Sequence, residues 1–425
     1  MKNINRPVAV VGAMRIPFVK SFREYSRVSN QEMLTATLQA LINKYKLNGG
    51  LIGDVALGAI MNSSKDWNLS REVVLGTDLD ARTPAFNVQR ACGTSLEAVN
   101  LIALKISSGQ IDSGIAGGSD TNSDLPIMAS QALAWKLIDA NQAKSFGQRV
   151  SKFLTIKPSD LKPVYPNIVE PRTGMSMGQH TERMVKQWNV SREEQDALAL
   201  VSHQRAAKAY SDGFYDDMLA PFKDATRDTI VRADTTLQKL GALKPAFDKS
   251  GSGTLTAGNS TLFTDGAASV LLASEEYATR HGLAVQAYVT DVQATAIDFV
   301  HGAGLLMAPT VAVAQLLKRN NLTLQDFDFY EIHEAFSGQV LCTLKAWESD
   351  AYCRNELHLD GALGAIDRSK MNVKGGSVAL GHPFGATGAR VVANMAKLLS
   401  QKGSGRGLVS VCTAGGMGVA AILER

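Results

Sequence analysis

Residues 89–120 read QRACGTSLEAVNLIALKISSGQIDSGIAGGSD, and this stretch decides the fold. Apolar residues recur at helical spacing from Leu96 onward, which predicts a helix, and the short run SGIAGG that follows predicts a buried strand. The same order returns near the end of the chain, where FGATGARVVANMAKLL precedes a second predicted strand. We expect each strand to end in Ala-Gly-Gly, at 116–118 and at 414–416. The repeat indicates a duplicated α/β half.

Outward from this stretch, short apolar runs alternate with amphipathic runs on both sides. VAVVGA and DVALGAI predict strands near the N-terminus, with the helical pattern LTATLQALINKY between them. From about residue 123 to 262 the chain is more polar, and a capping box of Ser191 and Glu194 predicts the start of a long helix there. The alternation resumes after that segment. We therefore expect two α/β halves, 1–122 plus 263–285 and 286–425, and an inserted loop domain at 123–262.

Composition excludes several classes of protein. The 425 residues carry a net charge of +4, which is too small for this length to indicate a nucleic-acid partner. The four cysteines form no CxxC pair and no zinc-finger spacing with histidine, so neither a disulfide framework nor a metal site is predicted. No apolar run approaches the roughly 20 residues that span a bilayer. The early run 8–14 is a poor signal peptide, and we expect a cytoplasmic protein without a transmembrane segment.

The segment 125–165 has an unusual balance of charge. It carries six basic and two acidic side chains, so its local charge equals that of the whole chain. Phe146, Val150, Phe153 and Leu154 recur at helical spacing beside the basic side chains. Two interpretations stay open: a helix with a solvated face that packs on its own protein, or a surface that docks on a partner or a membrane.

Four side chains could carry covalent chemistry. Cys92 stands directly before a predicted helix, where free backbone N–H groups and the helix dipole are expected to lower its pKa. Cys412 stands near the end of a predicted strand, His333 follows another in YEIHEAFSG, and His382 lies in the Gly-rich GGSVALGHPFGATGARVV. Position 337 is serine, so His333 does not begin an HExxH zinc motif. Two thiols and two histidines near glycines suit acyl transfer through a covalent intermediate.

Taken in order, QRACGTS, HEAF, GHPFGATGAR and CTAGGMG resemble the signature blocks of the thiolases across nearly the whole chain. The resemblance implies a duplicated, layered αβαβα core with an inserted loop domain that binds coenzyme A. It also implies cleavage of 3-ketoacyl-CoA to acetyl-CoA and a shortened acyl-CoA, or the reverse condensation. Cys92 would be the nucleophile, His382 its activator, Cys412 the acid and base, and His333 a support for the thioester oxyanion. Coenzyme A would be a substrate, and no cofactor is implied.

The same resemblance assigns binding groups. The backbone N–H groups of Cys92 and Ala414 would bind the oxyanion of the tetrahedral intermediate. Many thiolases have glycine at the latter position, but a backbone donor survives that change. Contacts to the acyl-CoA carry over to five further residues: Met177, Ala257, Thr261, Ala335 and Phe336. Ser176 stands where some relatives have a histidine.

Three features resemble the β-subunit of the fatty-acid oxidation trifunctional complex. Most thiolases have Asn where this chain has His333, whereas that branch has His. The block GGSDTNSDLP and the basic segment 125–165 are also similar to it. This resemblance implies a degradative thiolase of fatty-acid β-oxidation that forms a homodimer or homotetramer and docks on an α-subunit of such a complex.

Three alternatives remain. An acetyl-CoA acetyltransferase specific for acetoacetyl-CoA would use the same four reactive residues. A ketoacyl synthase also uses one Cys with two His, but Cys412 argues against it, because synthases need no thiol base at that position. A thiolase-fold carrier of CoA or lipid without catalysis would have no need for the complete set of reactive side chains.

Overall fold

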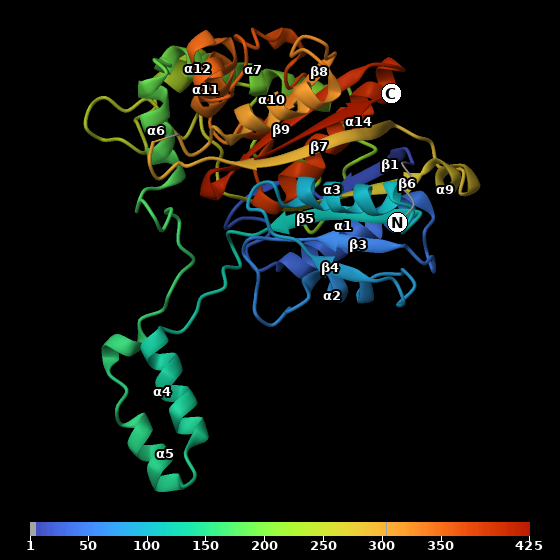
Figure 1. Ribbon diagram of the computed structural model, residues 1–425. Coiled ribbons are helices and arrows are strands. Elements are labelled where there is room, and N and C mark those ends of the chain that lie inside the picture. Colours follow the sequence, from blue (N-terminus) through green and yellow to red (C-terminus); the bar gives the residue numbers. More distant parts are fainter. Residues whose placement is uncertain (1–5, 303) are drawn as a thin grey trace.

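The computed structural model describes residues 6–302 and 304–425 (Figure 1). Its strands are β1 (Val8–Arg15), β2 (Val19–Lys20), β3 (Asp54–Leu57), β4 (Ala85–Asn87), β5 (Ser113–Asp120), β6 (Thr264–Ser274), β7 (Ala287–Ala296), β8 (Phe329–Ile332), β9 (Arg406–Thr413) and β10 (Met417–Glu424).

The α-helices are α1 (Asn30–Tyr45), α2 (Leu69–Leu75), α3 (Thr94–Ser107), α4 (Gln131–Gln142), α5 (Phe146–Phe153), α6 (Met177–Gln187), α7 (Arg192–Ser211), α8 (Leu237–Gly241), α9 (Glu275–Arg280), α10 (Ala308–Asn320), α11 (Ser337–Glu348), α12 (Asp350–Asn355), α13 (Ser377–Leu380) and α14 (Thr387–Lys402). Short 3-10 helices are η1 (Pro158–Leu161), η2 (Arg368–Lys370), η3 (Phe384–Ala386) and η4 (Ala414–Gly416).

The strands of the described residues form one mixed sheet of ten strands. Its order is β4-β3-β5-β6-β1-β7-β10-β9-β8, and β2 pairs with β6 outside this path. β3 is parallel to β4 and β5, and β8 is parallel to β9. The two halves of the sheet meet where β1 pairs Ala9 with Tyr288 and Val10 with Ala287. The N-terminal half of the sheet, from β4 to β1, is therefore joined to the C-terminal half, from β7 to β8, through these two residue pairs.

Successive side chains of each strand enter different layers, because they point to opposite faces of the sheet. In β1, Val10 packs in the cluster that contains α3 and α14, whereas Val11 packs with α1. In β10, Val419 joins the cluster of α3 and α14, and Ala420 packs with α10 and α11. The layers are therefore α1, the N-terminal half, α3 with α14, the C-terminal half, and α10 with α11 (Figure 1). The expected layered α/β core is confirmed.

The two central helices approach each other closely. A Cβ added to Gly388, in the first turn of α14, would lie 2.3 Å from the backbone nitrogen of Leu96 in α3. Only glycine allows this approach without displacement of a backbone. The approach brings the start of α3, after Cys92, beside the start of α14, after His382.

The first Ala-Gly-Gly was wrongly expected to end its strand. Residues 116–118 lie inside β5, which continues to Asp120. The physical reason is that β5 stays paired with β6 up to Asp120, opposite Gly266. The glycine at 118 instead reflects close packing, since a Cβ there would lie 2.2 Å from the carbonyl oxygen of Gly385. The second Ala-Gly-Gly does follow its strand, as η4, and Gly415 has a left-handed φ of 74° there.

Most of the inserted segment packs on the C-terminal half. α11 contacts both α6 and α7, and α7 also contacts α13. The predicted long helix is present as α7, and its N-terminus has the predicted capping box of Ser191 and Glu194. A buried ion pair joins the insertion to the core: Arg15 of β1 donates to both carboxylate oxygens of Asp228, at 2.6 and 2.8 Å.

Helices α4 and α5 form a hairpin that projects away from the layered body (Figure 1). The two helices pack against each other, and α4 also contacts η1. Phe146, Val150 and Phe153 lie on α5, Leu154 is its C-cap, and all four are exposed. The apolar stripe in 125–165 therefore does not pack on the layered body. Within the described residues, no helix has the length and apolar character needed to cross a membrane.

Candidate active site

Cys92 lies in a strained turn at the start of α3. The helix begins at Thr94, so the thiol stands at its N-terminal end, as predicted. Ala91 has a φ of 45°, a left-handed conformation that costs a non-glycine residue about 1–2 kcal/mol. Thr94 holds the turn, because its Oγ1 donates to the Ala91 carbonyl at 2.6 Å and accepts from the Arg90 N–H at 2.9 Å. Strain of this kind is typical of functional sites.

His382 reaches the thiol from the turn between α13 and α14. Its Nε2 lies 3.2 Å from Cys92 Sγ, and its Nδ1 lies 2.6 Å from Thr387 Oγ1. The chain enters the turn through Gly381, whose φ is 100°, and the His382 N–H donates to Thr264 Oγ1 at 2.8 Å. Burial lowers the pKa of His382 to about 3. The imidazole is therefore neutral and can accept a proton.

A buried carboxylate shapes the same turn. Asp120, at the end of β5, accepts hydrogen bonds from the N–H groups of Gly385 at 2.7 Å and Met61 at 2.8 Å. Burial raises the pKa of Asp120 to about 7, although these N–H groups favour its charged form. The sequence analysis did not single out Asp120, and its position at the end of a glycine-rich strand was the available signal.

Cys412 lies one residue before the end of β9 and is 2% exposed. It packs in one cluster with Ala335 and Phe336. Burial and the neighbouring Cys92 thiol raise the pKa of Cys412 well above its usual value. The second thiol is therefore neutral, and Cys92 lies near enough to contribute to its raised pKa.

His333 follows β8 and lies against His382. The ring centroids are 4.1 Å apart, with an angle of 48° between the planes. Nδ1 of His333 lies 2.7 Å from Ser377 Oγ, whereas its Nε2 is buried and has no hydrogen-bond partner among the described residues. Burial, His382 and Arg390 lower the pKa of His333 well below its usual value. Both histidines of the site are therefore neutral.

The expected lowering of the Cys92 pKa is wrong. The residue as a whole is half-buried, yet desolvation raises the pKa of its thiol to about 12. This increase in the pKa is larger than the decrease caused by hydrogen bonds from the backbone N–H groups of Ala414 and of Cys92 itself, which favour the thiolate. The argument from the helix start considered one element, whereas desolvation depends on every segment packed around the sulfur. The same two N–H groups are the predicted oxyanion donors.

The predicted contacts to the acyl-CoA lie on several segments, and Met177, Ala335 and Phe336 pack in the cluster of Cys412. Thr261 donates to the Ala335 carbonyl through both its N–H and its Oγ1, each at 3.0 Å. Met177, the first residue of α6, packs in the same cluster as Phe336. Ala257 is exposed in the turn that precedes Thr261.

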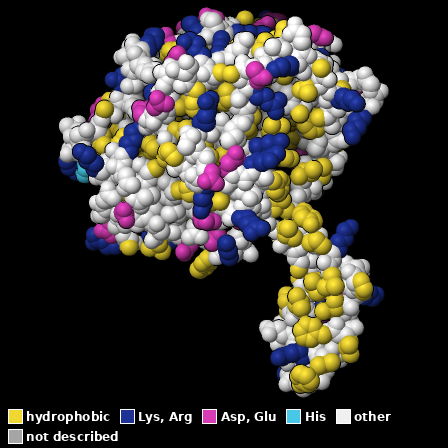
Figure 2. All heavy atoms as spheres, turned by 180° about the vertical axis from the view of Figure 1, so that it is seen from behind, with side chains coloured by type: hydrophobic (Ala, Val, Ile, Leu, Met, Phe, Trp, Pro, Cys, Tyr) yellow, Lys and Arg dark blue, Asp and Glu magenta, His cyan; other side chains and the backbone are white. Residues whose placement is uncertain are grey.

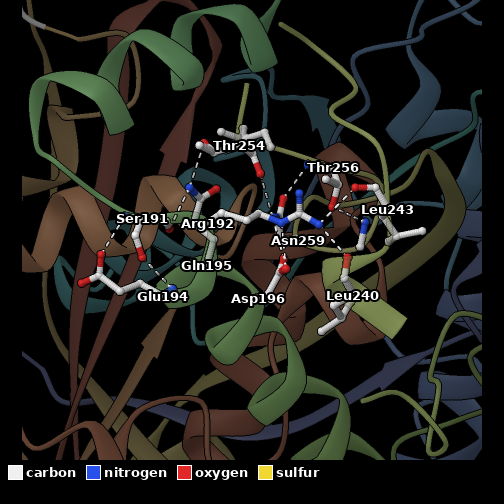
Figure 3. A network of polar contacts seen from close by, with 12 residues as sticks. Ser191, Arg192, Glu194, Gln195, Asp196, Leu240, Leu243, Thr254, Thr256 and Asn259 are labelled. Carbon is white, nitrogen blue, oxygen red and sulfur yellow. Dashed lines mark hydrogen bonds and ion pairs between the residues drawn. The ribbon is translucent and has the colours of Figure 1, made fainter. Parts of the chain in front are cut away.

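A polar network from α7 holds this turn (Figure 3). Asp196 accepts from Arg192 Nε at 2.7 Å and from Asn259 Nδ2 at 2.9 Å. Asn259 Oδ1 in turn accepts from the Thr256 N–H at 2.8 Å, and its carbonyl accepts from the Ser337 N–H at 2.9 Å. The first helical turn of α7 thus fixes the segment that carries two of the predicted acyl-CoA contacts.

Three residues behind the histidines were missed by the sequence analysis. Thr387 contacts the Nδ1 atom of His382, and Ser377 contacts that of His333. Arg390, a fully buried side chain of α14, donates to Ser377 Oγ at 2.8 Å. A charge at the second position of the otherwise largely apolar run ARVVANMAKLL was a signal for Arg390. The described residues contain no group of three or more His, Cys, Asp or Glu that could hold a metal ion.

Comparisons with known proteins agree with this arrangement. The family model for the thiolase N-terminal domain matches residues 8–276, and that for the C-terminal domain matches residues 283–425. A 3-ketoacyl-CoA thiolase of Yersinia pestis (strain Pestoides F) is 40% identical over 98% of this chain and 96% of its own length. A 3-ketoacyl-CoA thiolase of Yersinia pseudotuberculosis (serotype O:1b, strain IP 31758) has the same identity and coverage.

Two solved structures are similar to this protein over nearly the whole length of its chain. The acetyl-CoA acetyltransferase of Bacillus anthracis superposes with a TM-score of 0.81 at 28% identity and covers 100% of both chains. The Acat5 thiolase of Ascaris suum, solved in complex with coenzyme A, also gives a TM-score of 0.81, at 26% identity over 99% of this chain and 100% of its own. With two family models that together span nearly the whole sequence and relatives at 40% identity, the chain belongs to the thiolase family.

Proposed function

We propose that this thiolase is a degradative 3-ketoacyl-CoA thiolase of fatty-acid β-oxidation. The observation that supports thiolase chemistry is the contact of 3.2 Å between His382 Nε2 and Cys92 Sγ, with Cys412 as a second thiol nearby. The degradative branch is supported by the 40% identity to proteins named 3-ketoacyl-CoA thiolase. A nucleophile, its base and a separate acid form the set that acyl transfer with carbanion chemistry requires. The ketoacyl synthase alternative has no use for the second thiol.

In the first half-reaction, Cys92 attacks the ketone carbon, C3, of the substrate while His382 Nε2 accepts the thiol proton. The C2–C3 bond then breaks, and its electron pair forms the enolate of acetyl-CoA. Cys412 gives its proton to C2, which releases acetyl-CoA and leaves the shortened acyl group on Cys92. The N–H groups of Cys92 and Ala414 are suited to bind the C3 oxyanion, and His333 with His382 is suited to bind the thioester enolate.

In the second half-reaction, coenzyme A takes the place of acetyl-CoA. The Cys412 thiolate accepts the proton of the CoA thiol, and the resulting CoA thiolate attacks the acyl carbon on Cys92. The Cys92 sulfur leaves and regains its proton from His382. Each side chain ends as it began, and the products are acetyl-CoA and an acyl-CoA that is two carbons shorter.

We assign acyl-CoA binding to the loop domain, 123–262, and its junction with the C-terminal half. Met177, Ala257 and Thr261 would contact the acyl-CoA from the insertion, and Ala335 and Phe336 from the segment after β8. The hydrogen bonds from Thr261 to Ala335 support this assignment, because they join the two sides.

The degradative branch is tested by a series of 3-ketoacyl-CoA substrates of different length. Each additional CH₂ of a bound acyl tail contributes about 0.8 kcal/mol through apolar burial. We expect kcat/KM for six- to ten-carbon substrates to equal or exceed that for acetoacetyl-CoA. Activity confined to the four-carbon substrate would instead identify an acetyl-CoA acetyltransferase. A protein that binds these substrates and cleaves none would be a carrier.

We also infer that the α4–α5 hairpin docks on the α-subunit of a fatty-acid oxidation complex. Exposed apolar side chains cover one side of the hairpin from the body to its tip (Figure 2). The exposed apolar side chains of the hairpin include Trp135, Ile138 and Phe146, which are 63%, 52% and 82% exposed. An apolar strip of this length suits a protein surface that lies along it, and the surrounding excess of lysine and arginine favours an acidic rim on that surface.

The docking proposal is tested with purified α-subunit and the thiolase, followed by light scattering. We expect the double variant Trp135→Ser/Phe146→Ser to weaken the complex at least tenfold, as loss of apolar anchors does. Trp67→Ser is the matched control, because Trp67 is 90% exposed outside the hairpin. Equal affinity of wild type and double variant would contradict the proposal, as would binding to anionic lipid vesicles in place of the α-subunit.

We further propose that the protein acts in the cytoplasm as a homodimer or homotetramer. Its composition and the absence of a membrane-crossing helix in the described residues support the location. Light scattering of the purified protein tests the oligomeric state, and fractionation of cells tests the location. A monomer in the first experiment, or recovery with membranes in the second, would contradict the respective statement.

A further inference from the structure

The unpartnered Nε2 of His333 indicates what the buried network behind it does. His333 is 0% exposed, and the nitrogen that faces away from Ser377 has no hydrogen-bond partner among the described residues. A buried polar atom without a partner costs about 1–3 kcal/mol, so such an atom calls for an explanation. The ring lies 4.1 Å from that of His382, which contacts the nucleophile. The unpartnered atom therefore belongs to the reaction centre.

The hydrogen bonds of Ser377 decide which nitrogen of His333 carries the proton. Arg390 Nη2 lies 2.8 Å from Ser377 Oγ, and a guanidinium can only donate, so the serine oxygen accepts there. The hydroxyl has one proton left to donate, and its other described partner is His333 Nδ1 at 2.7 Å. The hydroxyl could also accept from Nδ1, but its own proton would then have no acceptor among the described residues. The arrangement that satisfies the hydroxyl has Nδ1 accept, which places the proton of the neutral ring on Nε2.

His382 has the opposite arrangement. Thr387 Oγ1 donates to the carbonyl oxygen of Pro383 at 3.3 Å, because a carbonyl can only accept. The threonine oxygen must then accept from His382 Nδ1, at 2.6 Å. Nε2 of His382 keeps a lone pair, and this atom faces the Cys92 thiol at 3.2 Å. One histidine is thus arranged as a base and its neighbour as a hydrogen-bond donor.

We propose that Ser377, oriented by Arg390, is a positioning residue that fixes His333 as an Nε2–H donor to the thioester oxyanion. The proposal rests on the proposed thiolase reaction and adds two residues to it. Arg390 is itself held in the interior, where its Nη1 lies 3.6 Å from Glu331 Oε2. A fixed donor needs no reorganisation when negative charge develops on the substrate oxygen, and this is the source of its catalytic effect.

The first test is spectroscopic and uses the wild-type protein labelled with ¹⁵N-histidine. The chemical shifts distinguish a protonated from an unprotonated ring nitrogen, and a His333→Asn sample identifies the His333 signals. We expect Nε2 to be protonated and Nδ1 to be unprotonated. A proton on Nδ1 in the wild-type protein would overturn the proposal. This readout does not depend on turnover, so it remains valid if the protein has no thiolase activity.

The second test compares Ser377→Ala with Ser410→Ala. In Ser377→Ala we expect protonation of His333 to divide between its two nitrogens and kcat to fall by about 10- to 100-fold, with KM changed less than about threefold; removal of a complete oxyanion donor costs about 10²–10³ in kcat. Ser410 is the matched control, because it is also buried but its hydroxyl has no described partner. Alkylation of Cys92 should be the same in both variants. Wild-type kcat in Ser377→Ala would overturn the proposal.

Discussion

At the scale of single residues, the proposed nucleophile Cys92 and its proposed base His382 form a neutral pair. Burial holds the pKa of Cys92 at about 12 and that of His382 at about 3. Transfer of the proton from sulfur to imidazole is therefore unfavourable in the free enzyme. Attack on a substrate carbonyl moves the negative charge to an oxygen that backbone N–H groups can bind. In the proposed reaction the thiolate is therefore formed only as it attacks the substrate.

The pH dependence of Cys92 alkylation follows from these values. A group with a raised pKa stays protonated below that pKa, so the thiolate fraction should rise through the whole range from pH 6 to 9. We expect the rate with iodoacetamide to rise about tenfold per pH unit without a plateau, since the thiolate fraction rises about tenfold for each pH unit below the pKa. Mass spectrometry of the modified peptide measures it. A plateau below pH 8, or label on Cys342 or Cys353 in place of Cys92, would contradict the assignment.

Replacement of Cys412 should separate the two chemical steps. In Cys412→Ala, acylation of Cys92 by acetyl-CoA should remain detectable, because His382 is unchanged. Exchange of the acetyl methyl protons with solvent should fall by about 10²–10⁴-fold, the usual contribution of a general base. Deuterium incorporation into acetyl-CoA is the measurement. Exchange at the wild-type rate would remove Cys412 from the mechanism.

At the scale of elements, the crossing of α3 and α14 holds the site together. Gly388→Ala would place a Cβ 2.3 Å from the Leu96 nitrogen. We expect the helices to separate, a loss of about 1–3 kcal/mol of stability from overpacking, and a fall in kcat of at least tenfold. Thermal unfolding and thiolysis measure the two effects. Gly147→Ala in α5 is the control, because a Cβ there meets no atom within 4 Å. Equal effects of the two substitutions would show that the crossing is not responsible.

At the scale of the whole molecule, a buried ion pair fastens the insertion to the core. Asp228 accepts two hydrogen bonds from Arg15 and one from the Phe18 N–H, at 2.8 Å. Asp228→Asn leaves the guanidinium without its counter-charge, which costs about 3–5 kcal/mol at a buried site. We expect a marked fall in Tm. Asp350→Asn, in the exposed pair with Arg354, should leave Tm unchanged. A similar Tm in both variants would contradict this role.

Local patterns in the sequence predicted several of the helices and strands and indicated four candidate reactive residues. Apolar periodicity predicted α3, because burial of one helix face imposes a regular spacing, and the short run SGIAGG predicted the buried strand β5. The capping box of Ser191 and Glu194 was predictable since both partners lie within one turn of helix. Cys92, His333, His382 and Cys412 were found because motif blocks place them beside glycines and at the ends of elements.

Only the tertiary structure decided what depends on contacts between distant segments. Ser377 contacts His333, and Arg390 contacts Ser377, although the three residues lie on different elements. A local pattern can mark Arg390 as unusual, but it does not show which side chains it contacts. The raised pKa of Cys92 also depends on several elements, because each segment that packs around the sulfur contributes to its desolvation. This desolvation opposes the local effect of the helix start. The sequence by itself therefore determined which groups are present, whereas their protonation states were decided by the fold, because desolvation and hydrogen-bond partners come from residues far apart along the chain.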